Sequence, residues 1–220
     1  LHLSLRRQRQ MCIRDRVIMK DDFKNIVSTD WLEQHLEAPD IRIIDSSWYF
    51  PQEKRNAEQE FLECHIPGAS FFDIDKIKDN DSDLPHMLPP SEMFNSTVRK
   101  LGIGDGHKVV IYDGLGMRSA ARLWWMFKVF GYSDVVVLDG GFPKWVKENR
   151  STTADLTEKE IRHLTIYEDK SIVADRDDVL RATKLNHCSI IDARSEGRFL
   201  GTEPEPRSSL KKATAKMIQA

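Results

Sequence analysis

The sequence is poor in cysteine, in long apolar runs and in excess charge of either sign. Its three cysteines, Cys12, Cys64 and Cys188, form no Cys-x-x-Cys pair among 220 residues. That spacing argues against a disulfide framework or a cysteine-rich metal site, and it predicts a reducing compartment. No apolar run approaches the length that spans a bilayer, which argues against a membrane protein. The formal net charge of −2 argues against nucleic acid as the main partner.

The chain otherwise has a globular composition, in which short apolar runs alternate with segments of helical spacing. Apolar residues make up 40% and charged residues 31% of the sequence. Helices are predicted at residues 27–38, 91–101, 118–130, 142–148 and 175–185. Strands are predicted at residues 41–45, 71–72, 108–112, 135–138 and 188–192. Strands that are apolar throughout indicate a parallel or mostly parallel sheet with helices on both faces, and so an α/β fold.

Three polar stretches are predicted to be loops. Residues 50–60 carry few apolar side chains, and residues 79–90 include three prolines, which leaves little room for regular structure. His86 lies in the second of these loops. Residues 113–116 follow a predicted strand and precede a predicted helix.

The most specific motif of the chain runs from Phe61 to Phe72. The segment His-Ile-Pro-Gly-Ala occupies residues 65–69. Pro67 fixes φ and Gly68 permits a positive φ, so the motif predicts a tight turn that leads into a buried strand. With its spacing, this motif resembles the first signature of the rhodanese sulfurtransferase family.

Further segments resemble the two-domain thiosulfate and 3-mercaptopyruvate sulfurtransferases of that family. Those similar to the first domain are residues 47–49, 72–75, 86–89, 110–113, 124–127 and 139–141, and those similar to the start of the second are residues 194–199 and 201–207. The resemblance implies a rhodanese-like parallel sheet with helices on both faces, followed by an incomplete second rhodanese domain.

The chain is therefore expected to divide into five parts. These are a disordered or foreign extension (1–18), a first, noncatalytic rhodanese domain (23–150), a linker (151–170), the start of a second rhodanese domain (171–207) and a tail unlike the family (208–220). A predicted helix followed by an apolar strand that ends in Asp occurs near the start of both domains, which indicates an internal repeat. The first residues are rich in arginine, as mitochondrial transit peptides are. We expect a cytoplasmic protein, with the mitochondrion as the alternative.

Resemblance to this family also implies a cysteine nucleophile. In such enzymes a thiolate takes sulfur from a donor as a persulfide, and converging backbone N–H groups between a strand and a helix stabilise its anion. The equivalent loop here is residues 113–118, which begins with Asp113 and contains no cysteine. The first domain is thus expected to be noncatalytic, and the cysteine to lie in a part of the second domain that this chain lacks.

Four residues match functional positions of the mercaptopyruvate enzymes. His86 and Asp75 match a proton relay, in which Asp75 would orient the imidazole. Arg198 and Arg207 match two arginines that hold the donor's carboxylate and carbonyl, a task that suits guanidinium groups. The alternatives are a solvated loop histidine and surface arginines.

We therefore expect a sulfurtransferase that moves sulfane sulfur from 3-mercaptopyruvate to a thiol or cyanide acceptor through a cysteine persulfide. The alternatives are a thiosulfate sulfurtransferase, a noncatalytic binding module and, less favoured, a rhodanese-related phosphatase. The expected partners are a small-molecule sulfur donor and a thiol acceptor, for example a thioredoxin-like protein. No cofactor, metal, nucleic acid or membrane is expected to take part, and the protein is expected to be a monomer.

Overall fold

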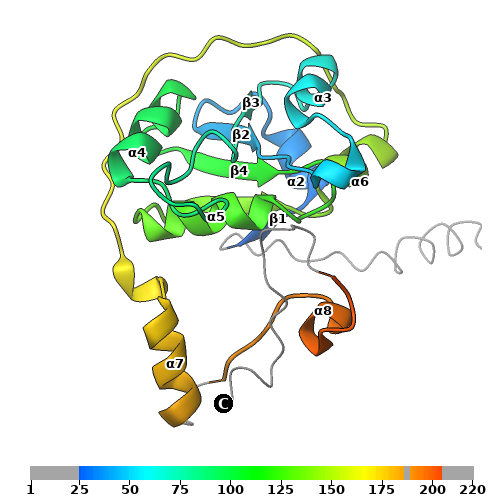
Figure 1. Ribbon diagram of the computed structural model, residues 1–220. Helices are drawn as coiled ribbons and strands as arrows, with labels where there is room; N and C mark the ends of the chain where they lie inside the picture. Colours follow the sequence, from blue (N-terminus) through cyan, green and yellow to red (C-terminus); the bar gives the residue numbers. More distant parts are fainter. Residues whose placement is uncertain (1–24, 186–188, 205–220) are drawn as a thin grey trace, which may run out of the picture.

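Five parallel strands form the centre of the fold, in the order β1-β5-β4-β2-β3. The computed structural model describes residues 25–185 and 189–204 (Figure 1). The strands are β1 (Ile26–Val27), β2 (Ile41–Asp45), β3 (Ser70–Phe71), β4 (Lys108–Tyr112) and β5 (Val135–Leu138). The parallel sheet expected from the apolar strands is thereby confirmed.

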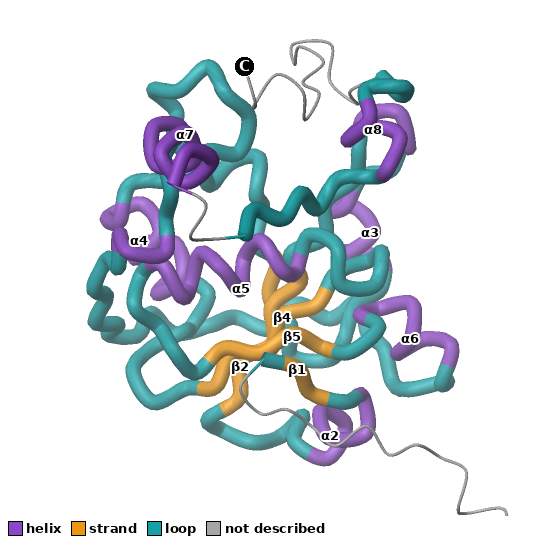
Figure 2. Tube along the Cα trace, turned by 90° about the horizontal axis from the view of Figure 1, so that it is seen from below, coloured by secondary structure: helices purple, strands orange, loops and turns teal. Residues whose placement is uncertain are grey.

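Side chains of the central strands alternate between two apolar layers. Val109 and Ile111 of β4 pack beneath α4 (Ser91–Lys100) and α5 (Ala120–Val129). Val110 and Tyr112 point to the other face, where α2 (Thr29–Gln34), α3 (Ala57–Glu63) and α6 (Gly141–Lys147) lie. Figures 1 and 2 show these two helical layers on either side of the sheet. Burial on both faces explains why the strands are apolar throughout.

The first predicted helix is shorter than expected. Val27 belongs to β1, and α2 begins only after Ser28, whose hydroxyl oxygen accepts a hydrogen bond from the Trp31 amide at 3.1 Å. The later helices are confirmed with small shifts of their ends. Gly131 follows α5 with φ of 76°, as expected for a residue just past a helix.

The predicted loop at residues 50–60 is wrong in part. It contains a 3-10 turn, η1 (Pro51–Glu53), and the first residues of α3. Asn56 caps α3 by accepting a hydrogen bond from the Gln59 amide at 3.0 Å. Phe61 is the buried residue of this helix, so the sequence carries no apolar periodicity that would have indicated it.

The predicted strand at 188–192 is wrong for the residues that the structure describes. Residues 189–192 form no strand, and Ile191 is 88% exposed. Within the described ranges no strand runs beside them, and an apolar run without a hydrogen-bonded neighbour does not form a sheet. Cys188 lies outside the described residues.

The segment after α6 runs along the domain before it reaches the C-terminal helices. Leu164 is buried in the core beneath α4 and α5, and the Tyr167 amide donates to the Phe130 carbonyl at 3.0 Å. Then follow η2 (Lys170–Ile172), α7 (Arg176–Leu185) and α8 (Glu196–Leu200), of which α7 and α8 bury no side chain (Figure 1). Whether these helices begin a second domain stays a prediction. The expected extension 1–18 and tail 208–220 lie outside the described residues.

None of the helices within 25–185 and 189–204 is long and apolar enough to cross a bilayer.

Candidate functional site

The carboxyl ends of the parallel strands bring several polar loops to one edge of the sheet. Asp45 ends β2 and is followed by Trp48, Asp75 comes shortly after β3, and Asp113 follows β4. In open parallel sheets this edge is the usual place for ligands. The candidate site therefore lies at this edge of the sheet.

A cavity of about 570 Å³ opens beside these loops. Its apolar walls come from aromatic and aliphatic side chains, with Val173 and Ala174 of the C-terminal segment at one side. Its polar groups belong to His86, Arg118, Ser119 and Arg122. None of the described residues that line it is Asp or Glu, so the charges that face it are positive.

His86 and Asp75 form a hydrogen-bonded pair in the loop between β3 and α4. The His86 Nε2 lies 2.5 Å from Asp75 Oδ1. The indole N–H of Trp48 donates to Asp75 Oδ2 at 3.0 Å, and the Trp48 ring meets the His86 ring edge to face. The His86 side chain is 16% exposed, whereas that of Asp75 is 61% exposed. An imidazole held by a carboxylate in this way is suited to proton transfer.

The backbone of His86 is held by α5. His86 has a φ of 56°, which is uncommon for a residue with a side chain. Its carbonyl oxygen accepts a hydrogen bond from Arg122 Nη2 at 2.5 Å, and the Arg122 guanidinium stacks on the Trp125 ring. Burial lowers the pKa of Arg122. Sequence reasoning missed Arg122 and Trp48; a lone arginine in the apolar helix at 120–129 was the available signal.

Asp113 points inward and binds its own loop. Its Oδ1 accepts hydrogen bonds from the amides of Leu115 at 2.9 Å and Met117 at 3.1 Å, and its Oδ2 accepts one from Ala120 at 2.8 Å. The side chain is fully buried. The amides that converge in this loop are thus occupied by a carboxylate that belongs to the chain itself.

Asp45 lies beneath the same loop and is linked to it by Ser47. The Ser47 hydroxyl donates to Asp45 Oδ1 at 2.5 Å and accepts from the Gly114 amide at 2.8 Å. Burial raises the pKa of Asp45 to about 6, the hydrogen bonds from Ser47 oppose that shift, and the charge of Asp113 adds to it. A Cβ on Gly114 would collide with the Tyr49 hydroxyl, so a larger residue here would have to displace that side chain.

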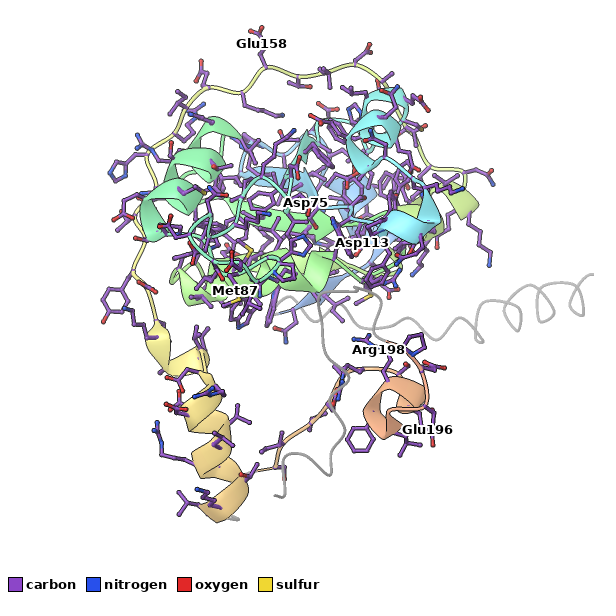
Figure 3. All side chains as sticks on the ribbon, viewed as in Figure 1. Asp75, Met87, Asp113, Glu158, Glu196 and Arg198 are labelled. Carbon is purple, nitrogen blue, oxygen red and sulfur yellow. The ribbon has the colours of Figure 1, made fainter. Side chains whose placement is uncertain are left out.

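The structure does not bring all four predicted site residues together. Asp75 and His86 meet, but Arg198 lies on α8 and is not among the described residues that line the cavity. Figure 3 shows Asp75, Met87 and Asp113 within the sheet domain and Arg198 on the C-terminal segment. Arg207 lies outside the described residues. The functional roles of these four residues stay predictions.

Cys64 is the one cysteine within the described residues, and it does not line the cavity. It is half-buried at the C-terminal end of α3, where its amide donates to the Glu60 carbonyl. Cys12 and Cys188 lie outside the described part of the chain.

Comparison with known proteins gives consistent matches. The model of the rhodanese-like domain matches residues 28–148. Thiosulfate/3-mercaptopyruvate sulfurtransferase 1, mitochondrial, from Arabidopsis thaliana is 42% identical over 207 residues, which cover 84% of this chain and 55% of the relative. Rat 3-mercaptopyruvate sulfurtransferase is 39% identical over 194 residues, which cover 86% of this chain and 65% of the relative.

A solved structure agrees with these matches. The crystal structure of a 3-mercaptopyruvate sulfotransferase from Escherichia coli superimposes with a TM-score of 0.78 at 37% identity, and covers 86% of this chain and 71% of that one. The chain thus spans 55% of the length of the plant relative and 65% of that of the rat relative.

Proposed function

Since the chain belongs to the rhodanese-like domain family, we propose that its protein moves sulfane sulfur from 3-mercaptopyruvate to a thiol or cyanide acceptor through a cysteine persulfide. The observation that carries the proposal is the His86–Asp75 pair beside a mainly apolar cavity whose charged lining groups are arginines. The activities named for the plant and rat relatives support it.

The pair favours mercaptopyruvate over thiosulfate for a chemical reason. When a thiolate takes the sulfur of 3-mercaptopyruvate, the C–S bond breaks and leaves the enolate of pyruvate, which must gain a proton at carbon. His86 is the group that would supply this proton, with Asp75 orienting its ring. Thiosulfate leaves as sulfite, and no carbon atom has to be protonated.

The cysteine that carries the persulfide has to come from elsewhere in the protein. Asp113 occupies the loop where it would be expected, and Cys64 lies away from the cavity. We place the cysteine in a second rhodanese domain, to which residues 171–207 would belong. Arg198 and Arg207 would approach the donor from that domain, although the described structure keeps Arg198 apart from the cavity.

We further propose the acceptor, the oligomeric state and the compartment. A thiol is the acceptor, for example on a thioredoxin-like protein, and the protein acts as a monomer without a cofactor. It acts in the cytoplasm or the mitochondrion, and the name of the plant relative supports the second compartment.

Thiocyanate production tests the proposal. The full-length protein that contains this chain is assayed with cyanide and either 3-mercaptopyruvate or thiosulfate, and residues 1–220 are assayed alone. Mercaptopyruvate is expected to react faster, and residues 1–220 are expected to be inactive. Much faster turnover of thiosulfate would overturn the choice of donor. Activity of residues 1–220 that a Cys64→Ser or a Cys188→Ser change abolishes would overturn the placement of the nucleophile.

The Asp113 carboxylate binds the amides of the loop that would otherwise serve a nucleophile. This favours a second function for residues 1–220 without the rest of the protein, that of a noncatalytic module which docks the catalytic domain. Mass spectrometry of residues 1–220 after treatment with the donor tests it. A persulfide on this polypeptide would contradict the module, whereas its absence is expected.

A further inference from the structure

Asp75 lies in a loop, beyond the residues that the sheet holds directly. Phe72, just after β3, is still tied to the sheet, because its amide donates to the Asp45 carbonyl at 2.8 Å. The Asp75 side chain is 61% exposed, and the groups that bind it, the His86 imidazole and the Trp48 indole, also belong to loops. A carboxylate that has to orient an imidazole from such a place needs support from its own backbone.

Asp73 gives that support through a turn closed by its side chain. Its Oδ1 accepts hydrogen bonds from the amides of Asp75 at 2.9 Å and Lys76 at 3.2 Å. Its backbone carbonyl accepts one from the Ile77 amide at 3.0 Å. A carboxylate that binds the amides two and three residues further on fixes the backbone between them. Because Asp73 directly follows Phe72, the turn begins next to the sheet and ends by placing Asp75.

The same turn is fastened to α3. The Lys76 ammonium group lies 3.0 Å from Asp73 Oδ2 and 3.1 Å from Glu58 Oε2. These ion pairs are exposed at Lys76, so they contribute little to the stability of the fold. The two oxygens of Asp73 therefore have separate tasks. Oδ1 binds the amides of the turn, and Oδ2 binds a group that also contacts a helix.

We propose that Asp73 is a positioning residue, whose two amide hydrogen bonds hold the Asp75 carboxylate against the imidazole of His86. This inference rests on the proposed function, in which Asp75 orients that imidazole for proton transfer. Asp73 is not among the described residues that line the cavity, so it acts on the reaction through Asp75 and not through the donor.

Three substitutions separate the acceptor oxygen of Asp73 from its charge. Asp73→Asn keeps an oxygen for the two amides and loses the charge, Asp73→Glu keeps the charge and moves the carboxylate out of the turn, and Asp73→Ala loses both. In the full-length protein, kcat for 3-mercaptopyruvate is expected to fall about tenfold in the alanine and glutamate variants and to stay within about twofold in the asparagine variant, with KM little changed. If the alanine variant does not fold, the other two decide.

Thiosulfate and a second aspartate supply the controls. The rate with thiosulfate is expected to change little in every variant, because that donor needs no proton from the imidazole. Asp79 Oδ1 likewise accepts an amide hydrogen bond in the same loop, from Asp81 at 3.0 Å, and Asp79 does not line the cavity. Asp79→Ala is expected to leave kcat for both donors unchanged. An equal fall in Asp79→Ala and Asp73→Ala would overturn the specific role of Asp73.

A second measurement does not depend on sulfur transfer. The indole N–H signal of Trp48 in NMR spectra reports the position of the Asp75 carboxylate, which accepts its hydrogen bond. In the 220-residue protein this signal is expected to move in Asp73→Ala and Asp73→Glu, and to stay in place in Asp73→Asn and Asp79→Ala. The internal reference is the indole of Trp145, which donates to a backbone carbonyl on the other face of the sheet.

The inference is overturned by wild-type kcat for mercaptopyruvate in the alanine and glutamate variants, or by an unmoved Trp48 signal in both. A tenfold fall in Asp73→Asn would overturn it as well, because the effect would then come from the charge and its pair with Lys76. If the full-length protein has no activity with mercaptopyruvate, the proposed function fails, whereas the Trp48 signal still decides whether Asp73 positions Asp75.

Discussion

The loop after β3 and the loop after β4 leave the same edge of the sheet, and each presents a carboxylate in a different way. Asp75 is largely exposed and holds the imidazole of His86 beside the cavity. Asp113 is fully buried and accepts three amide hydrogen bonds from its own loop. The first carboxylate supports a group that can exchange protons with a ligand, whereas the second uses up the donors that a ligand would need.

The two loops at this edge of the sheet therefore differ in how their polar groups are used. A loop whose amides are bound by its own carboxylate gains rigidity and gives up binding. A loop that leaves an imidazole at the wall of a cavity keeps a group that can meet a ligand. If the proposed function holds, the cavity beside the loop after β3, and not the loop after β4, takes part in the chemistry.

The largest expected effect comes from His86. In the full-length protein, His86→Gln is expected to lower kcat for 3-mercaptopyruvate about 100-fold, because the enolate loses its proton donor. The rate with thiosulfate is expected to change little. Steady-state assays with both donors measure the difference.

His163→Gln is the matched control for that measurement. His163 also pairs with a carboxylate, that of Asp105, but neither residue lines the cavity. An equal loss of kcat in the two variants, or no loss in either, would show that the loop after β3 has no special role in the reaction.

The loop after β4, whose amides bind Asp113, is expected to contribute to the stability of the fold. Asp113→Asn removes one of the two acceptor oxygens and points an N–H group at a buried backbone donor. The free energy of unfolding is expected to fall by about 3 kcal/mol in urea titrations. Asp134→Asn, which breaks the exposed pair with Lys108, is expected to cost less than about 1 kcal/mol. If the Asp113 variant were as stable as its control, the loop would not depend on its internal carboxylate.

Asp45, which lies beneath the loop after β4, makes the free energy of unfolding depend on pH. Its pKa in the folded protein is raised to about 6, so the folded state binds this proton more tightly than the unfolded state does. Its stabilising effect is therefore complete below the unfolded pKa and is lost as pH rises through about 6. Between pH 8 and pH 5 the wild type is expected to gain about 1 to 2 kcal/mol from this group.

Unfolding titrations of Asp45→Asn across the same pH range isolate that contribution. The asparagine cannot titrate, so the difference between variant and wild type is expected to change by that amount from pH 8 to pH 5. A difference that does not vary with pH would mean that Asp45 titrates at its ordinary pKa.

Much of this arrangement could be predicted from the sequence, and the exceptions have physical causes. Apolar strands revealed the parallel sheet, and the motif at 61–72 pointed to the family and, through it, to His86 and Asp75. The helix α3 escaped because Phe61 is its buried residue. Arg122 and Trp48 escaped because their roles depend on contacts between loops and a helix far apart in the chain. Arg198 was predicted at the site, but its position depends on how α8 packs, which the local sequence pattern does not determine.

The smallest expected effect comes from Trp48. Its indole N–H donates a hydrogen bond to Asp75 and none to His86. Trp48→Phe keeps an aromatic ring, although a smaller one, and removes that donor, so kcat for mercaptopyruvate is expected to fall about 3- to 10-fold while KM changes little. Trp31→Phe is the control, because the Trp31 ring also contacts a histidine ring, that of His35, but in the other layer of helices. A fall in kcat confined to the Trp48 variant would show that the orientation of the Asp75 carboxylate in the loop after β3 contributes to the rate. A larger KM with unchanged kcat would instead assign Trp48 to the wall of the binding cavity.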